Sequence, residues 1–367
     1  MTAPRTLDDL STPAAIVDVE RMSANLDRMA DYARQHGLGL RPHTKTHKTP
    51  ELALEQLKRG ATGLTVATLR EAEVMSAVAD NLLIAYPPVG AARLQRLFAL
   101  PPHVRVTVAL DSMEALDGLG RAAREAGREV GVLVEADLGM GRVGVATPDQ
   151  VVQLARAVSA RPPLRFRGLL FYPGHIREPV DEQERALNAL ACDVARLRQA
   201  LDSADLPPEV VSGGSTPTAF STHRITGLTE FRPGTYIFND RTTAAVDACG
   251  WEECAYSILA TVVSTAVAGQ AVVDAGAKAL AKEEIRAPGF GGFGALLDRP
   301  EIAVKAVSEE HGLLDLSGTD WRPRVGDRVR VVPNHVCVSV NLQPRLWYVS
   351  GDEVQRTLPV AARGWTA

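Results

Sequence analysis

The sequence has few cysteines, no long apolar run and no excess of positive charge. Its four cysteines among 367 residues are widely scattered and follow no disulfide spacing, which indicates a reducing, cytoplasmic compartment. No run approaches the roughly 18 uninterrupted apolar residues of a membrane span. A net charge of −4 gives no reason to expect nucleic acid as a partner. The first residues lack a basic segment followed by an apolar one, so we expect no export signal.

The first two thirds of the chain alternate short apolar runs with amphipathic stretches, as expected for an α/β protein. About eight such repeats in roughly 230 residues favour a closed (β/α)8 barrel of the TIM type over an open doubly wound sheet. Because the apolar runs lack polar alternation, a parallel sheet covered on both faces is expected. The expected strands are Ala15–Val19, Leu38–Arg41, Gly63–Ala67, Leu82–Tyr86, Val104–Leu110, Val130–Glu135, Phe166–Phe171 and Glu209–Ser212. The expected helices are Arg21–Gln35, Pro50–Leu57, Leu69–Val78, Met113–Glu125, Pro148–Val158 and Glu182–Ala200.

After Asp240 the pattern changes to short apolar runs separated by Gly, Asp and Pro turns, without long helices. This predicts a second, smaller and mostly antiparallel β domain. Its expected strands are Ser257–Val267, Ala271–Asp274, Ile302–Val307, Arg328–Val332 and Val336–Val340. We therefore divide the chain into a barrel domain at residues 13–240 and a β domain at residues 241–367, to which the N-terminal residues 1–12 also belong.

A barrel gathers its chemistry at the carboxyl ends of its strands, and one such end is unusually basic. The stretch Arg41-Pro-His-Thr-Lys-Thr-His-Lys48 contains His43, Lys45 and His47. A lysine beside other cations loses its proton more easily, as an amine nucleophile must in order to attack an aldehyde. A solvated basic turn is the structural alternative.

The sixth and seventh strands also end in polar residues. Gly139-Met-Gly-Arg-Val-Gly144 spells the dinucleotide pattern GxGxxG, but the next helix starts later and no acidic residue follows about 20 positions on, so we reject that match. Arg142 is better explained as a fixed cation for a cofactor oxygen, or as part of a structural salt bridge. Tyr172 and His175 stand beside glycines that admit a close ligand.

Two glycine-containing turns are candidates for binding an anion. In Ser212-Gly213-Gly214-Ser215-Thr216 the backbone N–H groups and hydroxyls can point at a phosphate. Gly234-Thr235-Tyr236 can close the same cup. Taken singly, each is also compatible with an ordinary turn.

Pro333-Asn-His335-Val-Cys337 is a candidate metal site in the β domain. On a strand, residues i and i+2 face the same side, so the imidazole and the thiolate can converge on one ion. This pair suits Zn²⁺ and leaves coordination positions open for water or substrate. The alternative is a buried cysteine beside a capped histidine.

Together these motifs resemble the D-threonine aldolase/D-serine dehydratase family, which comprises fold-type III pyridoxal-phosphate enzymes related to alanine racemase. The resemblance runs in order along nearly the whole chain. The motifs that carry it are Arg41–Lys48, Val66–Glu73, Asp137–Gly144, Tyr172–His175, Ser212–Thr218, Arg232–Tyr236, Asp274–Lys278 and Pro333–Cys337. It implies a barrel that carries pyridoxal 5′-phosphate, a β domain that carries the metal, and a head-to-tail homodimer with the active site between subunits.

The resemblance also implies roles for single residues. Lys45 matches the Schiff-base lysine, and His43 precedes it in the cofactor site. Arg142 and Tyr172 match residues that contact the pyridoxal ring. The phosphate site corresponds to Gly213, Gly214 and Ser215 with Gly234, Thr235 and Tyr236, and the metal pair corresponds to His335 and Cys337. Some aldolases of this family carry a carboxylate at the second metal position and favour manganese. The cysteine at position 337 therefore favours zinc, and it also favours the dehydratase hypothesis for this chain.

The resemblance implies a pyridoxal-phosphate- and metal-dependent lyase acting on D-3-hydroxy amino acids. The first hypothesis is retro-aldol cleavage of D-threonine-type substrates to glycine and an aldehyde, with His175 and His47 as candidate bases or positioning groups. The alternative is a D-serine or 3-hydroxyaspartate dehydratase that gives a 2-keto acid and ammonia.

Two further hypotheses are weaker. A non-catalytic pyridoxal-phosphate carrier on a one-domain barrel does not need a β domain with a His-x-Cys pair. A racemase needs a second catalytic tyrosine from the β domain, and neither Tyr256 nor Tyr348 lies in such a motif.

Overall fold

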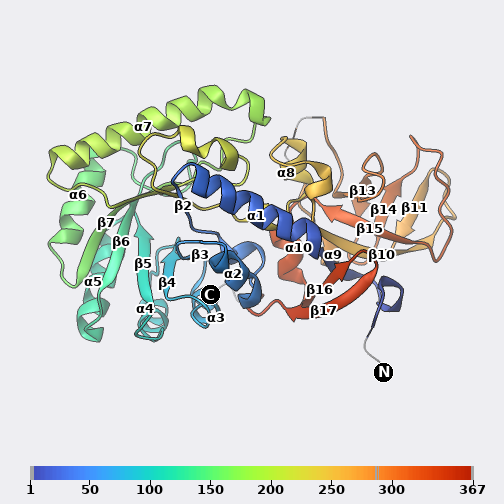
Figure 1. Ribbon diagram of the computed structural model, residues 1–367, viewed down its shortest axis with the longest axis horizontal. Helices are drawn as coiled ribbons and strands as arrows, with labels where there is room; N and C mark the ends of the chain where they lie inside the picture. Colours follow the sequence, from blue (N-terminus) through green and yellow to red (C-terminus); the bar gives the residue numbers. More distant parts are fainter. Residues whose placement is uncertain (1–3, 286, 288, 365–367) are drawn as a thin grey trace. The chain divides into compact units, whose positions relative to one another are not determined.

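The computed structural model describes residues 4–285, 287 and 289–364, and the chain forms two compact units (Figure 1). The barrel unit comprises Met29–Lys45 and Pro50–Gly234. The β unit comprises the described part of residues 1–28, Thr46–Thr49 and Thr235–Gly364. The outermost residues of the predicted β domain, 1–3 and 365–367, lie outside the described residues. Within the described chain, no helix is both long enough and apolar enough to span a membrane.

The barrel unit is built on an eight-stranded sheet in which all neighbouring strands are parallel. The strand order is β2-β9-β8-β7-β6-β5-β4-β3. A parallel bridge between His43 and Thr65 and a 2.8 Å hydrogen bond from Thr65 N to Pro42 O join the two edges of this sheet. The strands are β2 (Gly39–Leu40), β3 (Leu64–Val66), β4 (Asn81–Ile84), β5 (Arg105–Leu110), β6 (Val130–Glu135), β7 (Leu164–Leu170), β8 (Val210–Gly213) and β9 (Glu230–Phe231). The predicted α/β barrel is confirmed.

Both faces of this sheet are buried, which explains why its strands lack polar alternation. On one face, Leu83, Ala109, Leu133 and Leu170 from four neighbouring strands form a small apolar cluster. The other face packs into the large core formed with the helices. Between successive strands lie α2 (Pro50–Lys58), α3 (Leu69–Met75), α4 (Ala91–Phe98), α5 (Met113–Ala126), α6 (Pro148–Ser159) and α7 (Glu184–Ser203), after α1 (Val19–Gln35) at the start.

Local sequence signals set several helix ends. The Ser112 side chain caps α5 by accepting a hydrogen bond from Ala115 N, and Gly127 ends the helix in the left-handed conformation at φ 59°. Thr147 and Gln150 form a capping box before α6. The caps at Ser112 and Thr147 end the loops after β5 and β6, at the carboxyl ends of these strands.

The β unit contains a nine-stranded sheet that is antiparallel except where β1 pairs with β16. The predicted mostly antiparallel β domain is therefore confirmed as an architecture. Its strands are β1 (Ala14–Asp18), β10 (Tyr256–Ser264), β11 (Gln270–Val273), β12 (Gly294–Leu296), β13 (Val304–Val307), β14 (Gly312–Asp315), β15 (Arg328–Pro333), β16 (Arg345–Ser350) and β17 (Glu353–Pro359). Its short helices are α8 (Arg241–Ala245), α9 (Ala277–Leu280) and α10 (Val336–Leu342).

One predicted barrel strand is wrong and one barrel strand is missed, although the predicted number of barrel strands is right. The run expected as the first barrel strand is β1, which lies between β10 and β16 of the β unit. The eighth barrel strand is instead β9, which the sequence does not predict because it consists only of Glu230 and Phe231. The last segment of the β unit begins at Thr235. The domain division at residue 240 stays a prediction.

Candidate active site

The barrel unit contains a cavity of about 340 Å³ at the carboxyl ends of its strands. Lys45 lines it from a short 3-10 helix, Thr44–Thr46, which follows β2. The other residues that line the cavity are His43, Ala67, Ala85, Tyr86, Pro87, Glu135, Arg142, Val143, Leu170, Tyr172 and Arg232. Four predicted site residues, His43, Lys45, Arg142 and Tyr172, therefore share one cavity.

The Tyr172 ring lies near two cations in this cavity. Its centroid is 5.8 Å from Lys45 Nζ and 5.1 Å from the guanidinium carbon of Arg142. Both distances lie within the range of cation–π attraction. Arg142 lies on the cavity wall, and its predicted contact with a cofactor stays a prediction.

A buried polar network continues from the cavity into the barrel. Arg232 donates to Ser212 Oγ at 2.7 Å and to the Phe171 carbonyl oxygen at 2.8 Å. Ser212 Oγ in turn donates to Glu230 Oε1 at 2.7 Å, and Glu230 pairs with Arg41 at 2.8 Å. Because each member is buried and bonded, the network fixes the Arg232 guanidinium in place.

Burial also shifts the protonation of two cavity residues. It raises the pKa of Glu135 to about 7, against the opposing effect of the Arg232 and Arg142 charges. Burial lowers the pKa of Arg232 to about 10, against the opposing effect of the Glu230 and Glu135 carboxylates. A carboxyl group with a pKa near 7 and a fixed guanidinium therefore face the same cavity as Lys45.

The two candidate bases have very different surroundings. His175 is exposed and packs against the loop after β6, where a Cβ added at Gly139 would come within 2.9 Å of its Nε2. His47 is fully buried, and its Nδ1 accepts a hydrogen bond from Thr49 N at 3.1 Å. Neither is among the residues that line the cavity.

The predicted phosphate loop begins in the last residues of β8, and hydroxyl groups make hydrogen bonds within it. Gly214 has φ +84°, a conformation that favours glycine. Ser215 is buried, its N–H donates to Thr218 Oγ1 at 3.3 Å, and its hydroxyl lies 3.0 Å from the same atom. Gly213 is also buried, and it packs closely against the Phe171 ring: a Cβ added at Gly213 would lie only 2.2 Å from a ring atom.

In the β unit, the predicted metal pair lies at the start of a helix, so the predicted strand at Val336–Val340 is wrong. His335 is the N-cap residue of α10 and Cys337 is its second residue. The alternating Val-Cys-Val-Ser-Val sequence resembles a strand, but the Asp240 carboxylate accepts a hydrogen bond from Val336 N at 3.0 Å and so stabilises the helix start.

The helix start nevertheless brings the two side chains together. The Cys337 thiolate raises the pKa of His335, against burial, and hydrogen bonds to Asp240 and Cys337 raise it further. Cys337 Sγ also lies 3.1 Å from Thr46 Oγ1 and 3.9 Å from Thr235 Oγ1.

Thr235, which was predicted for the phosphate site, therefore contacts the thiol, and Tyr236 beside it is buried. Gly234 is the last residue of the barrel unit. Across the described ranges, no group of three or more His, Cys, Asp and Glu side chains is placed to hold a metal.

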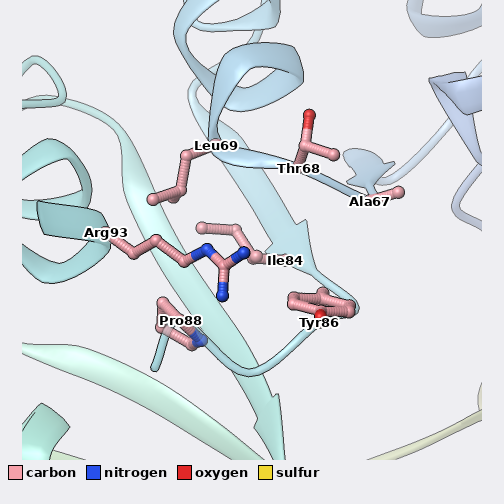
Figure 2. Close-up of a pocket in the computed structure, with 7 residues that line it drawn as sticks. All are labelled: Ala67, Thr68, Leu69, Ile84, Tyr86, Pro88 and Arg93. Carbon is pink, nitrogen blue, oxygen red and sulfur yellow. The ribbon is translucent and has the colours of Figure 1, made fainter. Parts of the chain in front are cut away.

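Sequence reasoning missed Glu135, Arg232 and Tyr86 as cavity residues. Each stands at or shortly after the carboxyl end of a barrel strand, and this position is the signal that could have identified them. Tyr86 also lines a second cavity of about 250 Å³, which shares Ala67 and Tyr86 with the first. Figure 2 shows Arg93 reaching across this second cavity towards Tyr86, with its guanidinium carbon 5.6 Å from the ring centroid.

The fold and the site together define a β/α-barrel protein of the enzyme type, with a lysine in a cavity at the carboxyl ends of its strands. Comparison with known proteins agrees with this. The family model described as "Alanine racemase, N-terminal domain" matches residues 17–242, and "Putative serine dehydratase domain" matches residues 255–349. The chain belongs to the D-threonine aldolase/D-serine dehydratase family of fold-type III pyridoxal-phosphate enzymes.

Individual relatives are similar over almost their whole length. D-threo-3-hydroxyaspartate dehydratase of Delftia sp. is 34% identical over 91% of this chain and 93% of that protein. D-threonine aldolase of Arthrobacter sp. is 31% identical over 97% of this chain and 94% of that protein. The crystal structure of D-threonine aldolase from Filomicrobium marinum is 34% identical, covers 100% of both chains and has a TM-score of 0.92.

Proposed function

We propose that this chain is a pyridoxal-phosphate- and divalent-metal-dependent lyase that cleaves D-threonine-type 3-hydroxy amino acids to glycine and an aldehyde. The observation that carries the proposal is the position of Lys45. Its amine lines a 340 Å³ cavity together with Tyr172, Arg142 and Arg232. That cavity offers an amine for an aldehyde and cations for anionic groups, so its residues fit pyridoxal phosphate.

The residues of the chain have distinct tasks in this proposal. Lys45 would hold the cofactor through its amine, while Arg142 and Tyr172 would contact its ring. Gly213, Gly214 and Ser215 would bind its phosphate through backbone N–H groups and a hydroxyl. When bound, the cofactor supplies an electron sink beside the α-carbon of the substrate, so that bonds at this carbon can break heterolytically.

The metal part of the proposal rests on His335 and Cys337. An imidazole and a thiolate are a donor set that suits Zn²⁺ better than Mn²⁺, and two protein ligands leave positions open for water or substrate. When bound, the ion supplies a Lewis acid that lowers the pKa of a coordinated hydroxyl group. His175 or His47 would then accept the proton of the substrate hydroxyl, or position the group that does.

Dehydration of D-serine or 3-hydroxyaspartate is the second candidate function. Cys337 in place of a carboxylate favours it, as does the similarity to the Delftia dehydratase. In that reaction Lys45 Nζ would accept the proton from the α-carbon and the β-hydroxyl would leave as hydroxide. We further propose a homodimer as the working assembly and the cytoplasm as its compartment.

Product analysis separates the two functions. Purified protein is incubated with D-threonine, D-serine or D-3-hydroxyaspartate, with pyridoxal phosphate and Zn²⁺ or Mn²⁺ added. Glycine plus an aldehyde supports the lyase proposed first, whereas a keto acid plus ammonia supports the dehydratase. An absence of both product pairs with all three substrates refutes the proposed function.

A further inference from the structure

We propose that Asp240 is the positioning residue of the metal site, holding His335 so that its Nε2 faces the ion. This inference rests on the proposed function, because it takes His335 and Cys337 as metal ligands. It concerns a residue that contributes no atom to the metal. The role follows from the hydrogen bonds of one buried carboxylate.

Asp240 is 1% exposed, and each of its carboxylate oxygens accepts two hydrogen bonds. Oδ1 accepts from Thr243 N at 2.9 Å and from Thr243 Oγ1 at 3.0 Å, which caps α8. Oδ2 lies 3.1 Å from His335 Nδ1 and accepts from Val336 N at 3.0 Å. One side chain therefore connects the first turn of α8 to the first turn of α10.

The contact at Oδ2 decides which ring nitrogen can bind a metal. A carboxylate oxygen is only an acceptor, so His335 Nδ1 must carry the proton of this hydrogen bond. The lone pair of Nε2 is then available for an ion, as in other sites where a carboxylate orients a metal-binding histidine. Since Oδ2 also accepts from Val336 N, it fixes both the imidazole and the backbone between His335 and Cys337.

Zinc affinity in the absence of turnover tests this role. Wild-type protein and the variants Asp240→Asn and Asp240→Ala are titrated with Zn²⁺ in competition with a chromophoric chelator. The asparagine side chain has one acceptor oxygen in place of two, so in either orientation it loses partners at His335 or at Thr243. We expect Asp240→Ala, which removes both acceptor oxygens, to bind Zn²⁺ about 10- to 100-fold more weakly. Asp240→Asn should weaken binding to this degree only if its amide nitrogen faces His335.

Thr243→Ala is the matched control. It removes the hydroxyl hydrogen bond at Oδ1 and leaves both contacts of Oδ2 in place. We expect its zinc affinity to stay within about twofold of wild type. Retained pyridoxal-phosphate absorbance and circular dichroism of each variant establish that a weaker affinity does not reflect unfolding.

A crystal structure of the zinc-loaded wild-type protein adds a test that needs no variant. Coordination through Nε2, with Asp240 on Nδ1, supports the inference, and coordination through Nδ1 or directly by Asp240 overturns it. Unchanged zinc affinity in a folded Asp240→Ala variant also overturns it. If wild-type protein binds no Zn²⁺ at all, the proposed metal site fails, and the positioning role fails with it.

Discussion

The Glu135 carboxyl group makes the free energy of unfolding depend on pH, and replacing this one residue should remove that dependence. Glu135 is 4% exposed at the end of β6, and burial raises its pKa from 4.5 to about 7. Between those two values the folded chain holds a proton that the unfolded chain has released. The contribution of Glu135 to the free energy of unfolding is therefore fully present below pH 4.5 and is lost as the pH rises through 7.

The size of the effect follows from the two pKa values. With 1.36 kcal/mol per pKa unit, the free energy of unfolding contributed by Glu135 falls by about 2.5 kcal/mol between pH 5 and pH 8. A glutamine at this position cannot titrate. We therefore expect Glu135→Gln to remove about 2.5 kcal/mol of the pH dependence that wild-type protein shows over this range.

Urea unfolding of cofactor-free protein at pH 5 and pH 8 measures this difference, and carboxyl ¹³C NMR measures the pKa directly. Glu129→Gln is the control, because Glu129 is exposed just before the start of the same strand. If Glu135→Gln and Glu129→Gln show the same pH dependence, Glu135 is not the buried proton-binding group described above. A measured carboxyl pKa near 4.5 would lead to the same conclusion.

Three further predictions follow from the site and its supporting network. Lys45→Ala should abolish the absorbance of bound pyridoxal phosphate and lower kcat by at least about 10³-fold. The control Lys58→Ala, at an exposed ion pair with Glu55, should leave both unchanged. A fully active Lys45→Ala variant would contradict the role proposed for Lys45. Treatment with a chelator should abolish activity, and added Zn²⁺ or Mn²⁺ should restore it, whereas unchanged turnover in metal-free protein argues against the ion. Arg41→Met should lower the free energy of unfolding by about 3–5 kcal/mol, because it removes the guanidinium that pairs with the buried Glu230 carboxylate. A loss below about 1 kcal/mol in thermal unfolding would contradict this.

Composition and apolar runs were enough to predict the two architectures, but not the position of every strand. The run at Ala14–Asp18 is buried on both sides, and such a run has the same pattern in a parallel barrel as in the middle of another sheet. β9 could not be found by pattern, because two residues carry no periodicity. β9 is defined by its pairing with other strands: Glu230 and Phe231 pair with β8 and with β2, which is far away in the sequence.

Residues at strand ends can be named as candidates from the sequence, whereas the contacts that support them cannot. Lys45, Arg142 and Tyr172 were predicted from polar residues that follow apolar runs, and the structure places them in one cavity. Asp240 has no such signal, since its importance depends on Val336 N and His335, about 95 residues further along the chain. Hydrogen bonds over such distances cannot be read from a single sequence.

Borohydride reduction followed by peptide mass spectrometry tests the central claim most directly. Protein incubated with pyridoxal phosphate is reduced, digested and searched for the mass of a phosphopyridoxyl group on lysine. We expect this mass on Lys45 and on no other lysine in the stretch from Arg41 to Lys48. Modification of Lys48 in place of Lys45, or no modified peptide at all, would contradict it.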